Sequence, residues 1–461
     1  MRTSIVGATV IFDEGVHPAT VVIAEDGTIE AVTRPGSVAD GTETIDASGL
    51  HLFPGAVDPH THLNDPGYTE SEDFFTGTCG AAGGGVTTVI EMPQSIPIVI
   101  NRERFLQKRE IAEGKAIVDF ALWGALTAEN VGDGGHALRE LADLGAIAFK
   151  AFTSESPEQP RLPDALLAEA MGLATELGLL VGVHCEDQPL IDYFTAKLKG
   201  EGRNDALVNA DSRPPIVEIE AARRVILLAE LVGARVHLAH VSHPETFRLV
   251  TEAKERGVDV TAETCAHFLS LSRDDVARVD SYGMCNPPLR DPEACEELWN
   301  FLAGGLIDCI GSDHCACTEE EKANPDYWQM PAGISGMQVM FPLIVGAAAG
   351  RGTDLSLIAR MFSSAPARRF GLSSRKGSIR PGADADVVLV DMESSWQVRG
   401  ADFFSKAPGT AYEGSTVRAR VMRTLVRGRT VYRDEGAGGE ILVEPGFGEF
   451  VQPARSALVS G

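Results

Sequence analysis

Long apolar runs, basic residues and targeting signals are what this sequence lacks. No apolar run approaches 18 residues, which excludes a transmembrane helix. Lysine and arginine total 40 against 66 acidic residues, and a net charge of −26 argues against nucleic acid or an anionic membrane as a partner. No charged n-region with an apolar h-region marks a secretory signal. We therefore predict a cytoplasmic protein that acts on a small molecule.

Disulfide and zinc-ribbon patterns are also missing. The eight cysteines show no spacing typical of a disulfide framework. Cys315 and Cys317 flank a single alanine, and no second cysteine pair lies at zinc-ligand spacing. The cysteines therefore favour a reducing compartment as well.

Short β-type runs are concentrated at both ends of the chain. The first fifty residues alternate such runs with Asp-Gly and Pro-Gly turns, and "KGSIRPGADADVVLVD" after residue 375 has the same texture. We expect residues 1–53 and 375–435 to pair into one small β-sandwich domain. The Gly-rich residues 436–461 are expected to form a C-terminal tail.

The middle of the chain, residues 54–374, alternates β-rich runs with amphipathic helical stretches. This alternation predicts an α/β fold with a catalytic (β/α)₈ TIM barrel, and a doubly wound open sheet is the alternative. The eight expected strands are residues 57–62, 87–92, 118–124, 146–152, 180–186, 235–242, 260–265 and 306–314.

Metal-ligand side chains stand at the ends of five of these runs. Residues two apart on a strand share a face, so His60 and His62 at the end of the first run point to one place. Barrel enzymes carry their active sites at these strand ends, which makes a shared metal site the sharper hypothesis. Taken singly, each residue also fits a packed core histidine, a lysine reaching the rim or a helix cap. The set is His60, His62, Lys150, His184, His240 and Asp313, while His237 is expected to pack outward from the opposite strand face.

Lys150 needs a chemical reason to belong to such a set. An ammonium group binds no metal, but burial lowers the pKa of a lysine from about 10.4. The neutral amine can add CO₂ to form a carbamate, whose two oxygens are able to bridge two cations.

Several motifs together resemble the cyclic amidohydrolases, the group of allantoinase, hydantoinase, dihydropyrimidinase and dihydroorotase. The resemblance runs in order from about residue 1 to 450. It is carried by "FPGAVDPHTHLNDPG", "AAGGGVTTVIEMP", "AFKAF", "VHCE", "LAHVS", "CNPPLRD", "GSDH" and "KGSIRPGADADVVLVD".

This resemblance implies a barrel with a terminal β-sandwich, two divalent ions, usually zinc, and a homo-oligomer, either a tetramer or a dimer. His60, His62 and Asp313 would hold one ion and His184 and His240 the other, with N6-carboxylated (carbamylated) Lys150 bridging them. Asp313 would also carry a proton from the attacking hydroxide to the leaving ring nitrogen. The product of a cyclic amide would be an open-chain ureido acid.

Departures from the group's motifs narrow the expected substrate. Asn64 stands where dihydroorotases typically carry an arginine, and Glu155 where D-hydantoinases and dihydropyrimidinases usually carry a tyrosine. Allantoinase and an L-hydantoinase-like enzyme remain, although Tyr68 and Ser71 depart from allantoinases. We expect allantoin as substrate and 5-substituted hydantoins as the alternative, with substrate contacts from Asn64, Asn286 and Ala332.

Two hypotheses lie outside catalysis. A non-enzymatic relative that keeps this fold as an assembly module would have lost metal ligands, whereas every ligand position is occupied here. An unrelated α/β binding protein with core histidines would bind no metal, so metal stoichiometry separates it from the enzyme.

Overall fold

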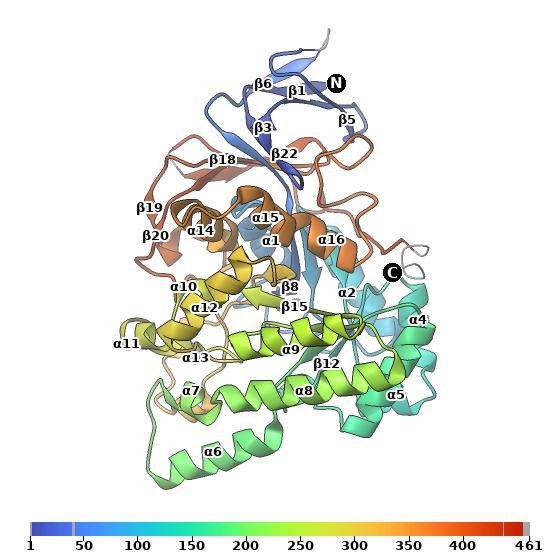
Figure 1. Cartoon of the computed structure of the whole chain (residues 1–461), viewed down its shortest axis with the longest axis vertical. Helices are drawn as coiled ribbons and strands as arrows, with labels where there is room; N and C mark the ends of the chain where they lie inside the picture. The colour runs from blue at the N-terminus through green and yellow to red at the C-terminus, as the bar shows by residue number, and fades with distance from the viewer. Residues whose placement is uncertain (1, 39–41, 437, 455–461) are drawn as a thin grey trace.

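Parallel strands close into a ring at the centre of this computed structural model, which describes residues 2–38, 42–436 and 438–454 (Figure 1). Each strand lies parallel to its neighbours. The third strand of the ring is divided into β10 and β11, and the eighth is divided into β16 and β17. Pairing of β17 with β8, the first strand, completes the ring. The bounds are β8 Ala56–His62, β9 Val86–Glu91, β10 Asp119–Leu122, β11 Gly124–Ala125, β12 Phe149–Phe152, β13 Val181–His184, β14 Val236–Leu238, β15 Val260–Cys265, β16 Cys309–Gly311 and β17 His314–Cys315.

Closure of this ring confirms the predicted TIM barrel and makes the open doubly wound sheet wrong. Each of the eight expected runs contains one strand position; β12, β13 and β14 are shorter than their runs, whereas β8, β9 and β15 are as long or longer. The β12 and β13 segments are buried along their whole length, as expected for parallel strands with helices outside and packed side chains inside.

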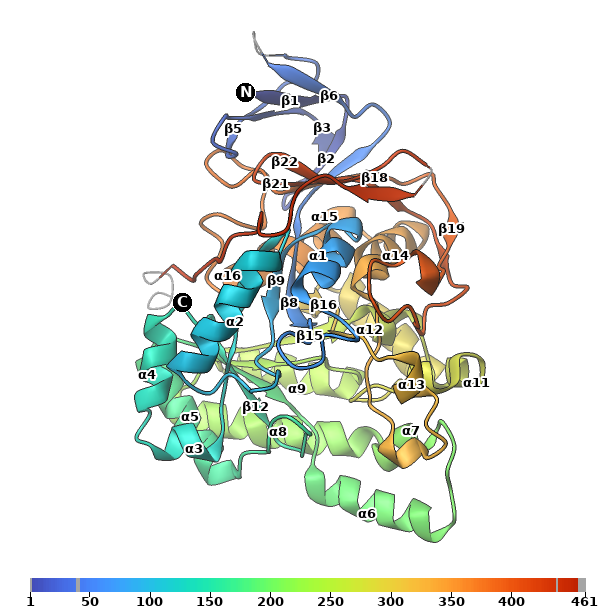
Figure 2. The same ribbon diagram turned by 180° about the vertical axis from the view of Figure 1, so that it is seen from behind.

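Helices cover the outside of the barrel (Figures 1 and 2). Three of them have proline as their first residue, where the missing N–H costs nothing: Pro215 in α8, Pro244 in α9 and Pro292 in α12. Two extra helices, α6 and α7, follow β13, and α6 lies at the end of the molecule opposite the β-rich sheets. The bounds are α1 Phe74–Gly83, α2 Arg102–Lys115, α4 His136–Asp143, α5 Asp164–Glu176, α6 Gln188–Gly200, α7 Val208–Ser212, α8 Pro215–Val232, α9 Pro244–Glu255, α12 Pro292–Ala303 and α14 Met337–Gly350.

Two further sheets stack beside the barrel and draw strands from both ends of the chain. Their order is β5-β4-β1-β6 in one and β23-β22-β21-β18-β7-β2-β3 in the other. A separate apolar core that includes Ile5, Val21, Leu52 and Leu389 lies with them. The bounds are β1 Thr3–Val6, β2 Thr9–Phe12, β3 Gly15–Pro18, β4 Thr20–Ile23, β5 Ile29–Thr33, β6 Glu43–Asp46, β7 His51–Pro54, β18 Val387–Asp391, β21 Arg420–Val426, β22 Arg429–Asp434 and β23 Gly439–Ile441.

Of the chain after residue 435, the structure describes residue 436 and residues 438–454. This part of the chain adds β23 to the larger sheet, and Phe450 then bridges to Phe120 of the barrel. Residues 455–461 lie outside the described residues, and the domain boundaries at 53/54, 374/375 and 435/436 stay predictions. Among the described helices, none is both long and apolar enough to cross a membrane.

A buried charge cluster joins the barrel to the β-sheets. The Lys376 ammonium lies 2.5 Å from Asp119 of β10, 2.8 Å from Asp384 and 2.7 Å from Asp386, and all four side chains are buried. The three carboxylates lie as close together as metal ligands do, but the Lys376 ammonium already occupies the place between them. Lys376 therefore neutralises acids of both parts of the molecule.

We expect Lys376→Met to destabilise the protein by about 3–5 kcal/mol, because it leaves buried Asp386 without a cationic partner among the described residues. Asp119 and Asp384, by contrast, keep Arg427 and Arg375. The shift of the urea denaturation midpoint measures this loss. Arg256→Met is the matched control, since Arg256 pairs with Glu230 at an exposed site and its loss should leave the midpoint almost unchanged. Equal midpoints for the two variants would contradict a joining role for Lys376.

Candidate metal centre

A cavity of about 670 Å³ opens at the carboxyl ends of the barrel strands. Its lining includes all of the metal ligands and substrate contacts predicted from the sequence. Strand ends far apart in the chain thus converge on one space: His60, His62, Lys150, His184, His240 and Asp313, with Asn64, Asn286 and Ala332 around them.

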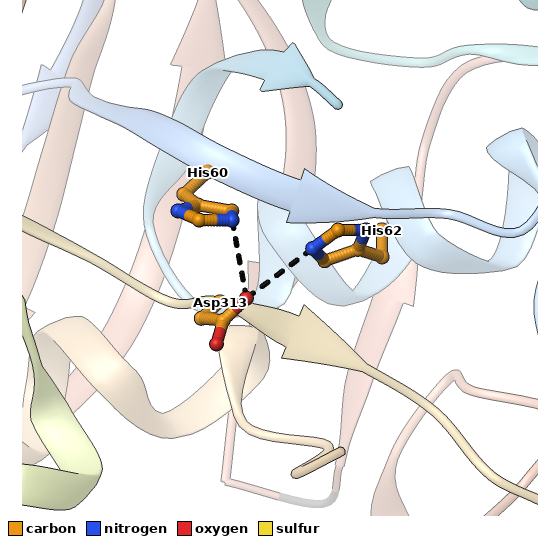
Figure 3. A group of neighbouring side chains, drawn as sticks. All are labelled: His60, His62 and Asp313. Carbon is orange, nitrogen blue, oxygen red and sulfur yellow. Dashed lines mark ion pairs between the residues drawn. The ribbon is translucent and has the colours of Figure 1, made fainter. Parts of the chain in front are cut away.

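Three of these side chains form a tight group at one side of the cavity (Figure 3). The Oδ1 atom of Asp313 lies 3.2 Å from His60 Nε2 and 3.3 Å from His62 Nε2. Burial is the main cause that lowers the pKa of His60 to about 4, so its imidazole is neutral and its nitrogen is free to bind a cation. Burial acts to raise the pKa of Asp313, but His60 and His62 outweigh it and hold that pKa at about 2.

A second histidine pair lies next to this group. His184 Nδ1 is 2.9 Å from His240 Nε2, and the His240 ring centre is 5.1 Å from that of His60. Burial, and after it the proximity of His184, Lys150 and His60, lowers the pKa of His240 well below its ordinary value. His60 in one half and His240 in the other therefore offer neutral imidazole nitrogens at neutral pH.

Lys150 on β12 supports the bridging interpretation. Its side chain is fully buried, and its Nζ atom has no hydrogen-bond partner among the described residues. Burial lowers the pKa of Lys150 to about 8, so a neutral amine is accessible near physiological pH. An orphaned buried amine is costly on its own. Four imidazoles, one carboxylate and this amine fit two divalent cations joined by a lysine carbamate.

The local backbone explains how Asp313 reaches the histidines. It sits in the break between β16 and β17 with φ of 46°, in the left-handed region that non-glycine residues rarely adopt. The buried carboxylate of Asp58 accepts hydrogen bonds from the backbone N–H groups of His60 and Ser312, at 3.2 and 3.0 Å. Asp58 therefore ties the first strand to the eighth beside the ligands of both.

Two of the three predicted substrate contacts, Asn64 and Asn286, differ in how their side-chain amides are bonded. The Asn64 amide donates to Ser71 Oγ and to the Ala316 carbonyl, so it braces its own loop. The Asn286 amide oxygen is buried without a hydrogen-bond partner in the described part of the chain. Asn286 is consequently the better candidate for accepting a substrate N–H.

Two buried glutamates behind the ligands were not singled out from the sequence. Glu263 Oε1 lies 2.5 Å from His60 Nδ1, and Glu186 Oε2 lies 3.0 Å from His184 Nε2. The sequence did contain a signal for Glu263, because a charged residue inside a buried strand such as β15 needs a partner. The expectation that His237 packs outward is wrong, because its Nε2 lies 3.3 Å from Glu263 on the side of the metal centre.

Barrel, cavity and ligand set together define the class of a metal-dependent barrel hydrolase. Comparison with known proteins agrees with this class. Residues 51–431 match the model of the amidohydrolase family. The chain belongs to the amidohydrolase family, and its resemblance to the cyclic amidohydrolases is confirmed.

Similar proteins extend over almost the whole chain. It is 38% identical to an allantoinase of Solibacter usitatus, covering 99% of this chain and 98% of the relative. It is 39% identical to an allantoinase of Rubrobacter xylanophilus, with 97% of each chain covered. The solved structure of the L-hydantoinase (dihydropyrimidinase) from Arthrobacter aurescens is similar with a TM-score of 0.93 at 30% identity, covering 98% of this chain and 99% of that one.

Carbamate formation on Lys150 should depend on pH in the metal-free protein. With a pKa of about 8, roughly 1% of the amine is neutral at pH 6 and roughly 90% at pH 9, so the neutral fraction rises with pH. At a fixed concentration of dissolved ¹³CO₂, we expect a buried carbamate NMR signal that grows over this range. Lys150→Arg should lack the signal; its persistence there, or equal intensity at both pH values, would contradict the assignment.

Proposed function

We propose that this enzyme hydrolyses the cyclic amide bond of allantoin to give allantoate. It would use two divalent metal ions, and we propose zinc as the metal. The observation that carries the proposal is the convergence of four imidazoles, Asp313 and the unpartnered Lys150 amine on one cavity. His60, His62 and Asp313 would hold one ion and His184 and His240 the other, with carbamylated Lys150 between them. Bound ions of this kind supply Lewis acidity and lower the pKa of a coordinated water.

Asp313 is the residue placed to move a proton. Its pKa of about 2 keeps the carboxylate ionised at neutral pH, so it can accept the proton of the attacking water. It then delivers that proton to the ring nitrogen as the carbon–nitrogen bond breaks. The ring carbonyl carbon ends as a carboxylate, and the ring nitrogen ends as part of an open ureido group.

The walls of the cavity favour a substrate with a polar substituent. Glu155, Arg213 and Asn209 line it, and Glu155 takes the position where a tyrosine is expected in D-hydantoinases. The buried amide oxygen of Gln94 also lines the cavity and has no hydrogen-bond partner in the described part of the chain. A ligand that leaves such a group unpaired is disfavoured, which favours the ureido group of allantoin over an alkyl chain. The Asn286 amide oxygen is available for a ring N–H.

A 5-substituted hydantoin remains the second candidate because part of the wall is apolar. Trp328, Met330 and Phe152 also line the cavity, and they would accept an aliphatic or aromatic substituent. The close structural likeness to the Arthrobacter aurescens L-hydantoinase supports this candidate. A cytoplasmic location and assembly into a dimer or tetramer stay predictions from the sequence.

The two substrates are separated by direct turnover. With zinc-loaded protein, we expect kcat/KM for (S)-allantoin to exceed that for a 5-alkyl-L-hydantoin by at least about 100-fold, because the alkyl group leaves cavity polar groups unpaired. Ureido-acid formation over time is the measurement, with Asp313→Asn as the inactive control. Preferential turnover of the hydantoin would reverse the assignment, and no turnover of either would refute it.

The bridging role of Lys150 has its own test. Lys150→Ala should lose bound zinc, and its activity should fall by more than the 10–100-fold typical of losing an outer contact of a metal ligand. Added short carboxylic acids should restore part of both by occupying the space of the carbamate. The measurements are the zinc content of the variant by elemental analysis and its turnover rate. If the variant retains two ions and full activity, Lys150 does not bridge them.

A further inference from the structure

Each half of the metal centre has one buried glutamate behind it. Glu263 on β15 and Glu186, two residues beyond the end of β13, are both about 1% exposed. Neither carboxylate has a place among the predicted ligands, yet each one contacts the ring of a ligand histidine. Their contacts to the histidine rings assign one glutamate to each half, and Glu263 also accepts a backbone hydrogen bond from a ligand of the other half.

Glu263 contacts ligands of both halves through one oxygen. Its Oε1 accepts from His60 Nδ1 at 2.5 Å and from the backbone N–H of His240 at 3.2 Å. The backbone of His240 has φ of 38°, a strained conformation that needs support from its surroundings. The other oxygen, Oε2, lies 3.3 Å from His237 Nε2, whose opposite ring nitrogen lies 2.8 Å from Thr261 Oγ1.

Glu186 contacts the other half alone. Its Oε2 lies 3.0 Å from His184 Nε2 and 3.3 Å from Arg213 Nε. Arg213 in turn donates to Asn209 Oδ1 at 3.0 Å, which keeps the guanidinium beside the glutamate. Burial acts to raise the pKa of Glu186, but Arg213 and His184 outweigh it and hold the pKa below its ordinary value.

These contacts decide which nitrogen each ring presents to the cavity. Because the Nδ1–H of His60 donates to Glu263, its Nε2 faces Asp313. Because the Nε2–H of His184 donates to Glu186, its Nδ1 faces His240. The two ligand histidines are therefore held as opposite tautomers.

We propose that Glu263 and Glu186 are positioning residues that fix the tautomer and raise the basicity of His60 and His184, each setting the affinity of one metal site. The inference rests on the proposed function, since it takes these histidines as metal ligands. A carboxylate that accepts the distal N–H of a ligand imidazole orients the ring, and its loss typically weakens metal binding 10–100-fold.

The test uses full-length protein and zinc alone. Glu263→Gln and Glu186→Gln keep the size of the side chain and remove its charge, and two-site zinc affinities come from titration against a chelator. We expect Glu263→Gln to weaken mainly the site of His60 by about 10–100-fold and Glu186→Gln mainly the site of His184. The two variants are independent, so failure of one to fold leaves the other decisive.

Glu218→Gln is the matched control. Glu218 is equally buried and accepts hydrogen bonds from Ser242, Thr246 and Arg290, but its carboxylate contacts no ligand histidine. Its substitution should lower thermal stability and leave both zinc affinities unchanged. It thereby separates a lost buried carboxylate from a lost contact to a ligand.

A second readout reports the tautomers directly. In ¹⁵N-histidine-labelled, zinc-loaded protein, His184 should carry its proton on Nε2 and His60 on Nδ1. Wild-type affinities in folded Glu263→Gln and Glu186→Gln, or equal weakening of both sites by each variant, would overturn the inference and leave the proposed function standing. A wild type that binds no zinc would overturn both.

Discussion

The seam between the first and the eighth barrel strand is the constraint on which the metal centre depends. Its strands come from opposite ends of the barrel sequence, so only ring closure brings His60 and His62 to Asp313. Buried Asp58 holds the seam by accepting a backbone hydrogen bond from each side. The eighth strand is interrupted between β16 and β17. Asp313 lies in this break with a positive φ, and its side chain therefore turns toward the histidines. Local irregularity in a rigid ring is what positions this ligand.

Burial prepares the ligands before any cation arrives. It is the largest cause lowering the pKa of His60 and His240, so protons do not compete for their nitrogens at neutral pH. The same burial leaves the Lys150 amine without a partner, which makes its chemical conversion favourable. The low dielectric of the site thus favours the neutral form of the imidazoles and of the amine. A neutral imidazole can coordinate a cation, and a neutral amine can react.

Strand periodicity was enough to predict the barrel and the convergence of the candidate ligands on one cavity, because each candidate stands at or near the end of a β-rich run and every such run faces the same mouth. Periodicity failed for His237, counted as lying opposite His240. The β14 strand ends at Leu238 and His240 has positive φ, so alternation of faces breaks between the two histidines. Glu186 was also beyond reach, since its contact with His184 depends on the path of the chain after β13.

Charge balance explains why glutamates stand behind the ligands. Two divalent cations would bring four positive charges into a largely buried site, whereas Asp313 and a Lys150 carbamate supply only two negative ones. Glu263 and Glu186 supply the other two from behind the imidazoles, where they strengthen the ligands and occupy no coordination position. Arg213 lies 3.3 Å from Glu186 and offsets part of that carboxylate's charge. With both ions bound, the two glutamates would balance charge from outside the coordination positions, which would stay open for substrate.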